Sequence, residues 1–120
     1  MSCQLNCVVR GGVLSAEVSG RSSAADAAWI GRAIVERASE QAVRRVMIDV
    51  RHFADRLGSL GELALAAALP GTGGRIAMVD IEEHDRYYAL HEERARRRGF
   101  ELRGFSDRGQ AASWLLEAGA

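Results

Sequence analysis

The residues best suited to chemistry lie in one short stretch, DVRHFADRLGSLGEL at positions 49–63. It contains Asp49, His52 and Ser59, and a serine beside a histidine and an aspartate is the pattern of a nucleophilic hydrolase. We expect the stretch to leave a buried strand, cross a loop and enter an apolar helix. That would place the three side chains near the carboxyl edge of a sheet, where open α/β sheets bind ligands.

A hydrolase using Ser59 and His52 is therefore one alternative, with Asp49 or Asp80 orienting the histidine. The sequence around the serine argues against it. A nucleophile elbow reads Gly-x-Ser-x-Gly, and Leu57 stands where its first glycine should be, which would crowd the strained turn. We assign no catalytic residue.

Two interpretations of Ser59 remain. With Glu62 three residues later it forms a capping box, in which hydroxyl and carboxylate satisfy free N–H groups at a helix start. The same position suits a phosphate group, because the positive end of a helix stabilises an anion. Ser59 is thus predicted to be a helix cap, and phosphorylation is the sharper alternative.

Three further motifs do not predict a cofactor or a metal. PGTGG at 70–74 follows a helix and precedes a strand, whereas phosphate loops have the reverse order. HEERA at 91–95 lacks the second histidine of a zinc-protease helix, and His84 with His91 would need two more ligands. RARRR at 94–98 is interpreted as a solvated helix end, with an acidic protein surface as its alternative ligand.

Composition excludes several classes of function. All 16 basic residues are arginine, so lysine nucleophiles, Schiff bases and phosphate-loop lysines are absent from the chain. The net charge is zero, which disfavours nucleic-acid binding. Cys3 and Cys7 would share one face of a strand about 13 Å apart, too far for a disulfide. We expect one domain over residues 1–120, without a signal peptide or membrane span, in the cytoplasm.

Hydrophobic periodicity predicts an α/β fold with a single five-stranded, mostly parallel mixed sheet and four helices. Two alternating strands around Gly11 and Gly12 form an N-terminal hairpin. Ser106 or Asp107 is expected to cap the last helix, with Ala111, Ala112, Leu115 and Leu116 facing inward beside Trp114. The later strands are expected at 46–50, 75–81 and 100–105, and the helices at 23–41, 59–69, 82–98 and from about 107.

The helix expected at 59–69 has no polar side chain from Leu63 to Leu69. A helix with one buried face would show a charged stripe over that length, so we expect another element or a partner subunit to cover it. The residues of this candidate interface or pocket are Leu60, Leu63, Leu65, Leu69, Tyr87 and Tyr88.

This order of elements, with VMIDVRHF, RIAMVD, RRRGFELRGFSD and AASWLL, resembles the bacterial STAS-like proteins of the SpoIIAA-like fold. That group contains anti-sigma-factor antagonists and many uncharacterised relatives, some compared with lipid-binding SEC14-type domains. The resemblance implies a βα superhelix and, in the antagonists, phosphorylation of the serine that matches Ser59. Ser59 and Gly61 fit the antagonist pattern, and Gly58 replaces its aspartate.

The leading hypothesis is a non-enzymatic STAS-like interaction module that acts as a homodimer or binds a regulatory protein partner. The alternative is a protein that binds a small apolar or lipid-like ligand beside the second and third helices.

Overall fold

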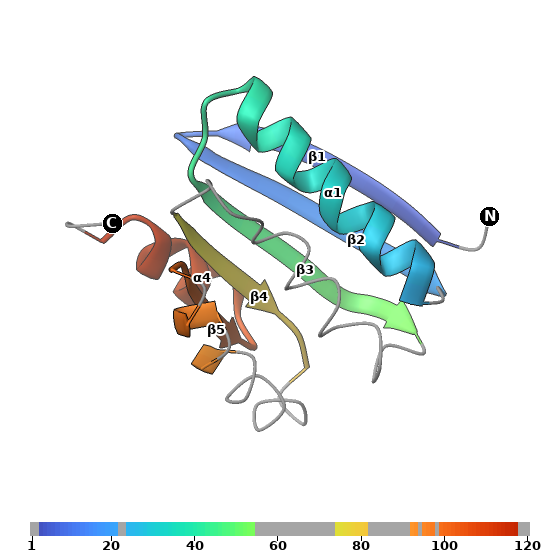
Figure 1. Ribbon diagram of the computed structural model, residues 1–120. Helices are drawn as coiled ribbons and strands as arrows, with labels where there is room; N and C mark the ends of the chain where they lie inside the picture. The colour runs from blue at the N-terminus through green and yellow to red at the C-terminus, as the bar shows by residue number, and fades with distance from the viewer. Residues whose placement is uncertain are drawn as a thin grey trace.

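The computed structural model describes residues 3–21, 24–54, 74–81, 92–93, 95–97 and 99–117. Within them the chain forms a five-stranded sheet with helices on both sides (Figure 1). The named elements are β1 (Cys3–Arg10), β2 (Val13–Arg21), α1 (Ala24–Glu40), β3 (Arg45–Ala54), β4 (Arg75–Val79), β5 (Glu101–Phe105) and α4 (Arg108–Leu115). No described helix is long and apolar enough to cross a membrane.

The predicted N-terminal hairpin is confirmed. β1 and β2 pair antiparallel from Cys3 opposite Gly20 to Arg10 opposite Val13. Gly11 and Gly12 form the turn with φ angles of 58° and 77°. Two consecutive positive φ angles are typical of a two-residue hairpin turn that matches the twist of the strands, and glycine adopts them without steric cost.

The rest of the sheet is parallel, and spatial order follows chain order from β1 to β5. Each parallel neighbour requires a crossover, and α1 supplies the first one, between β2 and β3. The predicted five-stranded, mostly parallel mixed sheet is therefore confirmed, and β1 and β5 are its edge strands.

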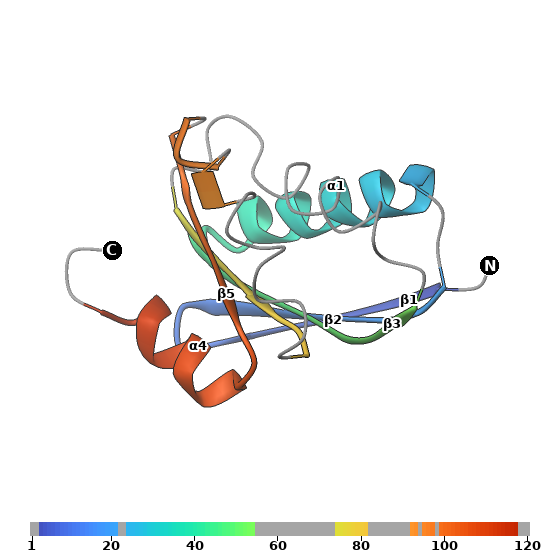
Figure 2. The same cartoon turned by 90° about the horizontal axis from the view of Figure 1, so that it is seen from below.

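Alternation along the strands builds two separate cores. On the α1 face, Ile30 and Ile34 pack with Val46, Ile48 and other strand residues. On the other face, the intervening Met47, Ala77 and Val79 pack beneath Ala111, Trp114 and Leu115 of α4. Figure 2 shows α1 and α4 on opposite sides of the sheet. Strands covered on both faces lack a polar side, which explains the nearly continuous apolar runs of β3 and β4.

Helix occurs at three places in the described residues, not at the four expected. These are α1, residues 92–97 except for the undescribed 94, and α4. The expected helix at 59–69 and the first part of the one at 82–98 lie outside the described residues. Ala95 is fully buried in the α1-side core, and Gly99 follows this helix with a φ of 88°, the left-handed conformation in which glycine commonly ends a helix.

The last helix begins as predicted and ends earlier. Asp107 is the cap, and its carboxylate accepts a hydrogen bond from the Gly109 N–H at 2.9 Å. Leu115 is buried, but the inward orientation predicted for Leu116 is wrong, since that side chain is 56% exposed. The helix ends at Leu115, and Leu116 leaves the helical backbone with φ −94° and ψ 2°.

β3 also extends further than predicted, so His52 lies in a strand and not in a loop. Glu17 pairs with Asp49 and Ser19 with His52, so one β2 residue faces two residues of β3. This β-bulge shifts the alternation by one position. As a result Val50 and Phe53, three residues apart, both enter the core beneath α1. Burial of Phe53 explains why the strand continues through this segment.

Candidate functional site

Most of the residues predicted to form a site lie outside the described part of the chain. They are Ser59, Leu60, Leu63, Leu65, Leu69, Tyr87 and Tyr88. The hydrolase candidates that the structure does describe are His52, Asp49 and Asp80, and these occupy three different environments.

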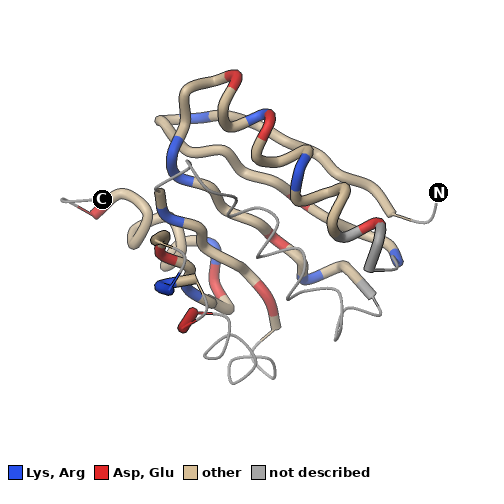
Figure 3. Tube along the Cα trace, viewed as in Figure 1, with Lys and Arg blue, Asp and Glu red and all other residues tan. Residues whose placement is uncertain are grey.

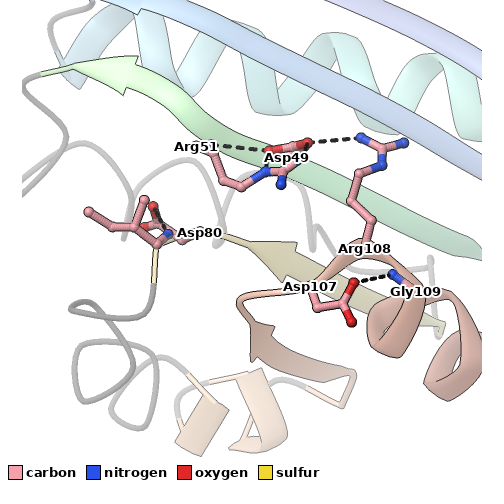
Figure 4. A network of polar contacts seen from close by, with 7 residues as sticks. Asp49, Arg51, Asp80, Asp107, Arg108 and Gly109 are labelled. Carbon is pink, nitrogen blue, oxygen red and sulfur yellow. Dashed lines mark hydrogen bonds and ion pairs between the residues drawn. The ribbon is translucent and has the colours of Figure 1, made fainter.

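Asp49 is the centre of a polar network on the α4 side of β3 (Figure 4). Its carboxylate is buried, with 3% of the side chain exposed. One oxygen, Oδ1, accepts hydrogen bonds from the backbone N–H and the Nε of Arg51, both at 3.1 Å. The other, Oδ2, accepts from Nη2 of Arg51 at 2.8 Å and from Nη1 of Arg108 at 2.9 Å. Both carboxylate oxygens are therefore engaged by arginines.

These contacts determine the protonation of the network. Burial alone would raise the pKa of Asp49, but the hydrogen bonds from Arg51 and Arg108 outweigh it and hold that pKa below its ordinary value of 3.8. The hydrogen bond to Asp49 in turn raises the pKa of Arg51. At neutral pH Asp49 is therefore an ionised carboxylate held by arginine side chains, which does not suit it to accept a proton.

The network connects two elements that are distant in sequence. Arg108 is the first residue of α4, so its bond to Asp49 fixes the start of that helix to the central strand. The two partners of Asp49 are Arg51, two positions further along the chain, and Arg108. Asp49 thus holds α4 in place and is not available to orient His52, whose side chain is exposed.

Asp80 lies elsewhere, at the carboxyl end of β4. It is 1% exposed, and its Oδ1 accepts a hydrogen bond from the Ile81 N–H at 2.7 Å. Its own N–H donates to the carbonyl of Phe105 at 2.9 Å, which extends the pairing of β4 with β5. In Figure 4 it stands apart from the Asp49 network, so the structure does not combine the two aspartates into one site.

Beside the Asp49 network the same face of the sheet is open. α4 covers β3, β4 and β5, whereas no described element covers β1 and β2 on this side (Figure 2). A shallow groove of about 240 Å³ lies here. We call its lining the open face, and its residues are Asn6, Val8, Arg10, Ser15, Glu17 and Arg108.

The open face carries both signs of charge. Arg10 and Arg108 lie beside Glu17, and Asp107 is close enough for its charge to act on Arg51. Val8 projects from this polar surrounding with 50% of its area exposed. Sequence reasoning missed the surface because Arg108 is brought to β1 and β2 only by the folding of α4. The one local signal was polar Gln4 and Asn6 alternating with apolar residues.

Two predicted structural roles are confirmed nearby. Exposed Arg96 and Arg97 pair with Glu93 at 2.6 and 3.5 Å, as expected of a solvated helix end. Cys3 and Cys7 are free thiols on the α1 side of β1. Burial raises the pKa of Cys7 more than Arg37 lowers it, so this thiol stays protonated and unreactive at neutral pH.

No protein-family model matches the chain, and no curated protein is similar to it in sequence. Solved structures are similar in fold. An anti-sigma factor antagonist from Mycobacterium paratuberculosis superposes with a TM-score of 0.66 at 18% identity, over 97% of this chain and 96% of that one. An uncharacterised DUF3478-family protein with a SpoIIAA-like fold from Shewanella loihica PV-4 gives 0.60 at 15% identity, over 96% and 94%. The chain therefore has the STAS- or SpoIIAA-like fold that its sequence predicted.

Proposed function

We propose that this chain is a regulatory protein-interaction module of the STAS-like type, with no catalytic chemistry of its own. The observation that carries the proposal is the full-length likeness in fold to an anti-sigma factor antagonist, a protein named for its action on another protein. The described polar residues support it, because the buried carboxylate of Asp49 is occupied in holding α4.

We further propose that the module forms a homodimer through the edge of β1. Edge strands in monomeric proteins are usually protected by charges, proline or bulges, because their free N–H and C=O groups can pair with another chain. β1 has no charged residue from Cys3 to Val9, no proline, and unbroken pairing with β2 over eight residues. Val8 and Val9 remain 50% and 38% exposed at this edge.

The sequence of β1 suits antiparallel pairing with its own copy. Residues opposite each other in such a pair share a face, so Asn6 would meet Asn6 of the second copy, or Cys7 would meet Cys7. In either register Leu5, Cys7 and Val9 form one apolar row on the α1 side. The only charge of the strand, Arg10, lies at its end, so the two copies of this arginine stay far apart.

Size-exclusion chromatography with light scattering tests the dimer. We expect the wild type to scatter as a dimer and Asn6→Lys to scatter as a monomer, since each new lysine would face either the lysine of the second copy or, in the Cys7 register, its Val8. Ser113→Lys, an equally exposed change on α4, should remain dimeric. A wild-type protein that is strictly monomeric at high concentration would overturn the homodimer.

Native mass spectrometry separates this proposal from its alternative. A clean mass of twice the chain supports association, whereas a co-purifying small molecule supports the apolar-ligand function expected around Leu60, Leu63, Tyr87 and Tyr88. Those residues lie outside the described part of the chain, so that function stays a prediction. So do the cytoplasmic location and the phosphorylation of Ser59, which phosphopeptide mapping after incubation with cell extract and ATP would detect.

A further inference from the structure

One row of residues crosses the sheet at the amino ends of the parallel strands. Val13 pairs with Arg45, Arg45 with Arg75, and Arg75 with Glu101. Alternation places these side chains on the α4 face, because Met47 and Ala77, two positions further along β3 and β4, belong to the core beneath α4. Arg45 and Arg75 are therefore like charges on adjacent strands, an arrangement that destabilises a sheet unless anions compensate it.

Neighbouring residues compensate the positive charge of Arg75. Its Nη1 donates to the carbonyl of Trp114 at 2.7 Å, and its guanidinium carbon lies 5.0 Å from the centre of the Trp114 ring. Glu101 and Glu117 lie 3.4 and 3.5 Å from Arg75 nitrogens. This arginine thus has an aromatic face on one side and two carboxylates within ion-pair distance.

Arg45 lacks an equivalent set of contacts. Among the described residues, the buried Nε of Arg45 has no hydrogen-bond partner and no carboxylate near it. The buried Nε of Arg75 also lacks a hydrogen bond, but it lies 3.4 Å from a carboxylate oxygen of Glu101. A buried donor without a partner costs free energy and is uncommon in folded proteins, so the Nε of Arg45 lacks an acceptor within the described part of the chain.

Next to Arg45 is a cavity of about 390 Å³. Its described lining comes from the β1–β2 turn, the segment after α1 and the start of β4, and consists of Gly12, Ala42, Val43, Arg44, Arg45, Gly74 and Arg75. Three of these residues are arginines and none is acidic. Figure 3 shows the same asymmetry along the backbone, with basic positions at the beginnings of β3 and β4, an acidic position further along β3 and another just beyond the end of β4.

Gly74 makes this convergence possible. A Cβ at this position would lie 1.9 Å from the carbonyl oxygen of Arg44, so only glycine permits the approach. The Arg75 N–H donates to that same carbonyl at 3.0 Å. The starts of β3 and β4 are thereby held together, and their arginines reach one cavity.

We propose that this cavity is a binding site for a small oxyanion of the phosphate or carboxylate class, with Arg45 as its principal ligand. A guanidinium presents parallel N–H donors that match two oxygens of such a group. The bound anion would also neutralise the repulsion between Arg45 and Arg75. This site lies at the amino ends of the strands and does not depend on the interaction surface proposed above.

Titration with inorganic phosphate at constant ionic strength tests the proposal, with sodium chloride as the balancing salt. We expect phosphate to raise the Tm of the wild type and to shift the amide resonances of Gly12 and Gly74. Arg45→Gln should weaken phosphate binding roughly tenfold, the loss of one charge-assisted interaction. Arg103→Gln, which removes an exposed arginine outside this cavity, should bind phosphate like the wild type.

The order of stabilities gives a second readout. Without phosphate, Arg45→Gln should melt at or above the wild-type temperature, because the repulsion with Arg75 is gone. In saturating phosphate the wild type should melt at a higher temperature than Arg45→Gln. An Arg45-dependent rise with acetate alone would also support the site and would identify its ligand as a carboxylate. Equal phosphate-induced shifts in the wild type and Arg45→Gln would overturn the proposal.

Discussion

On the α4 side, the two halves of the sheet differ in what covers them and in how their charges are paired. Over β3, β4 and β5, α4 is fixed by Arg108 to Asp49 and packs Trp114 on Phe105, with ring centres 5.7 Å apart. Over β1 and β2 the same face is open, and Val8 is half exposed. The covered half contributes packing and paired charge to stability. The open half has an exposed surface and, among the described residues, a strand edge without a neighbour, and both features suit binding.

The two edge strands show the same contrast. β5 has five residues and contains charged Glu101 and Arg103, and its Gly104 N–H donates a hydrogen bond to Oε1 of Glu92 at 3.3 Å. β1 has eight residues and only one charge, at its end. Natural sheets protect the edges that must stay unpaired, so the unprotected edge is the one we assign to a partner.

The largest loss of stability is expected in the covered half, from Gly74→Ala. The added methyl would overlap the carbonyl of Arg44 and separate β3 from β4 at their starts. We expect a loss of about 3 kcal/mol or more in the free energy of unfolding, measured by urea denaturation. Gly109→Ala is the matched control, since its Cβ would meet only Asp107 at 3.4 Å, and its stability should match or exceed the wild type. A Gly74→Ala protein as stable as this control would contradict the close approach.

The second largest loss of stability is expected from Asp49→Asn, at about 2 kcal/mol in the free energy of unfolding. The amide cannot accept from Arg51 and Arg108 at both ends, and two guanidinium groups lose their counter-charge. This expected loss is smaller than the loss from breaking a fully buried ion pair, because the side chains of Arg51 and Arg108 are 36% and 40% exposed. Asp107→Asn is the control, because asparagine caps a helix as well as aspartate. Equal stability of the two variants would show that the Asp49 network does not hold α4.

The difference in stability between the wild type and Asp49→Asn should depend on pH in a defined direction. The folded-state pKa of Asp49 lies below its ordinary value of 3.8, so the network stabilises the fold above that pH and loses its effect as pH falls through the folded pKa. We expect the gap between wild type and Asp49→Asn to be constant from pH 7 to about pH 5 and to narrow in more acidic solution. Urea titrations at pH 7, 5 and 3 would measure it, and a gap that widens on acidification would contradict the assignment.

The smallest effect on stability is expected in the open half. Asn6→Lys alters an exposed side chain and should change the free energy of unfolding of the monomer by less than about 0.5 kcal/mol. The same change should abolish self-association. Urea denaturation at low protein concentration isolates the first effect. A large loss there would mean that Asn6 supports the fold, which would remove the contrast between the halves.

Local patterns in the sequence predicted most of the sheet. Alternation from Cys3 to Val18, the paired glycines of the hairpin and the apolar runs of β3 and β4 each follow from a single segment. The bulge that keeps Phe53 buried was missed, because a shift of register depends on the partner strand. It moved His52 from the expected loop into β3.

The site was harder to predict because it combines distant residues. Asp49 and its partner Arg51 are only two positions apart, whereas Arg108 lies 59 residues further along, and the sequence did not predict that contact. Arg45 gave no signal either, since its neighbour in the sheet and the lack of an acceptor for its Nε among the described residues cannot be read from the chain. A local sequence pattern predicts interactions within one segment, but it does not predict contacts between segments that only the fold brings together.

Hydrogen exchange of β1 amides, measured as a function of protein concentration, shows whether the edge of β1 pairs with a second copy. We expect β1 amides that point away from β2 to become protected as the concentration rises, while β5 amides do not change and Asn6→Lys shows no such protection. Rapid exchange of those β1 amides at every concentration in the wild type would contradict this pairing.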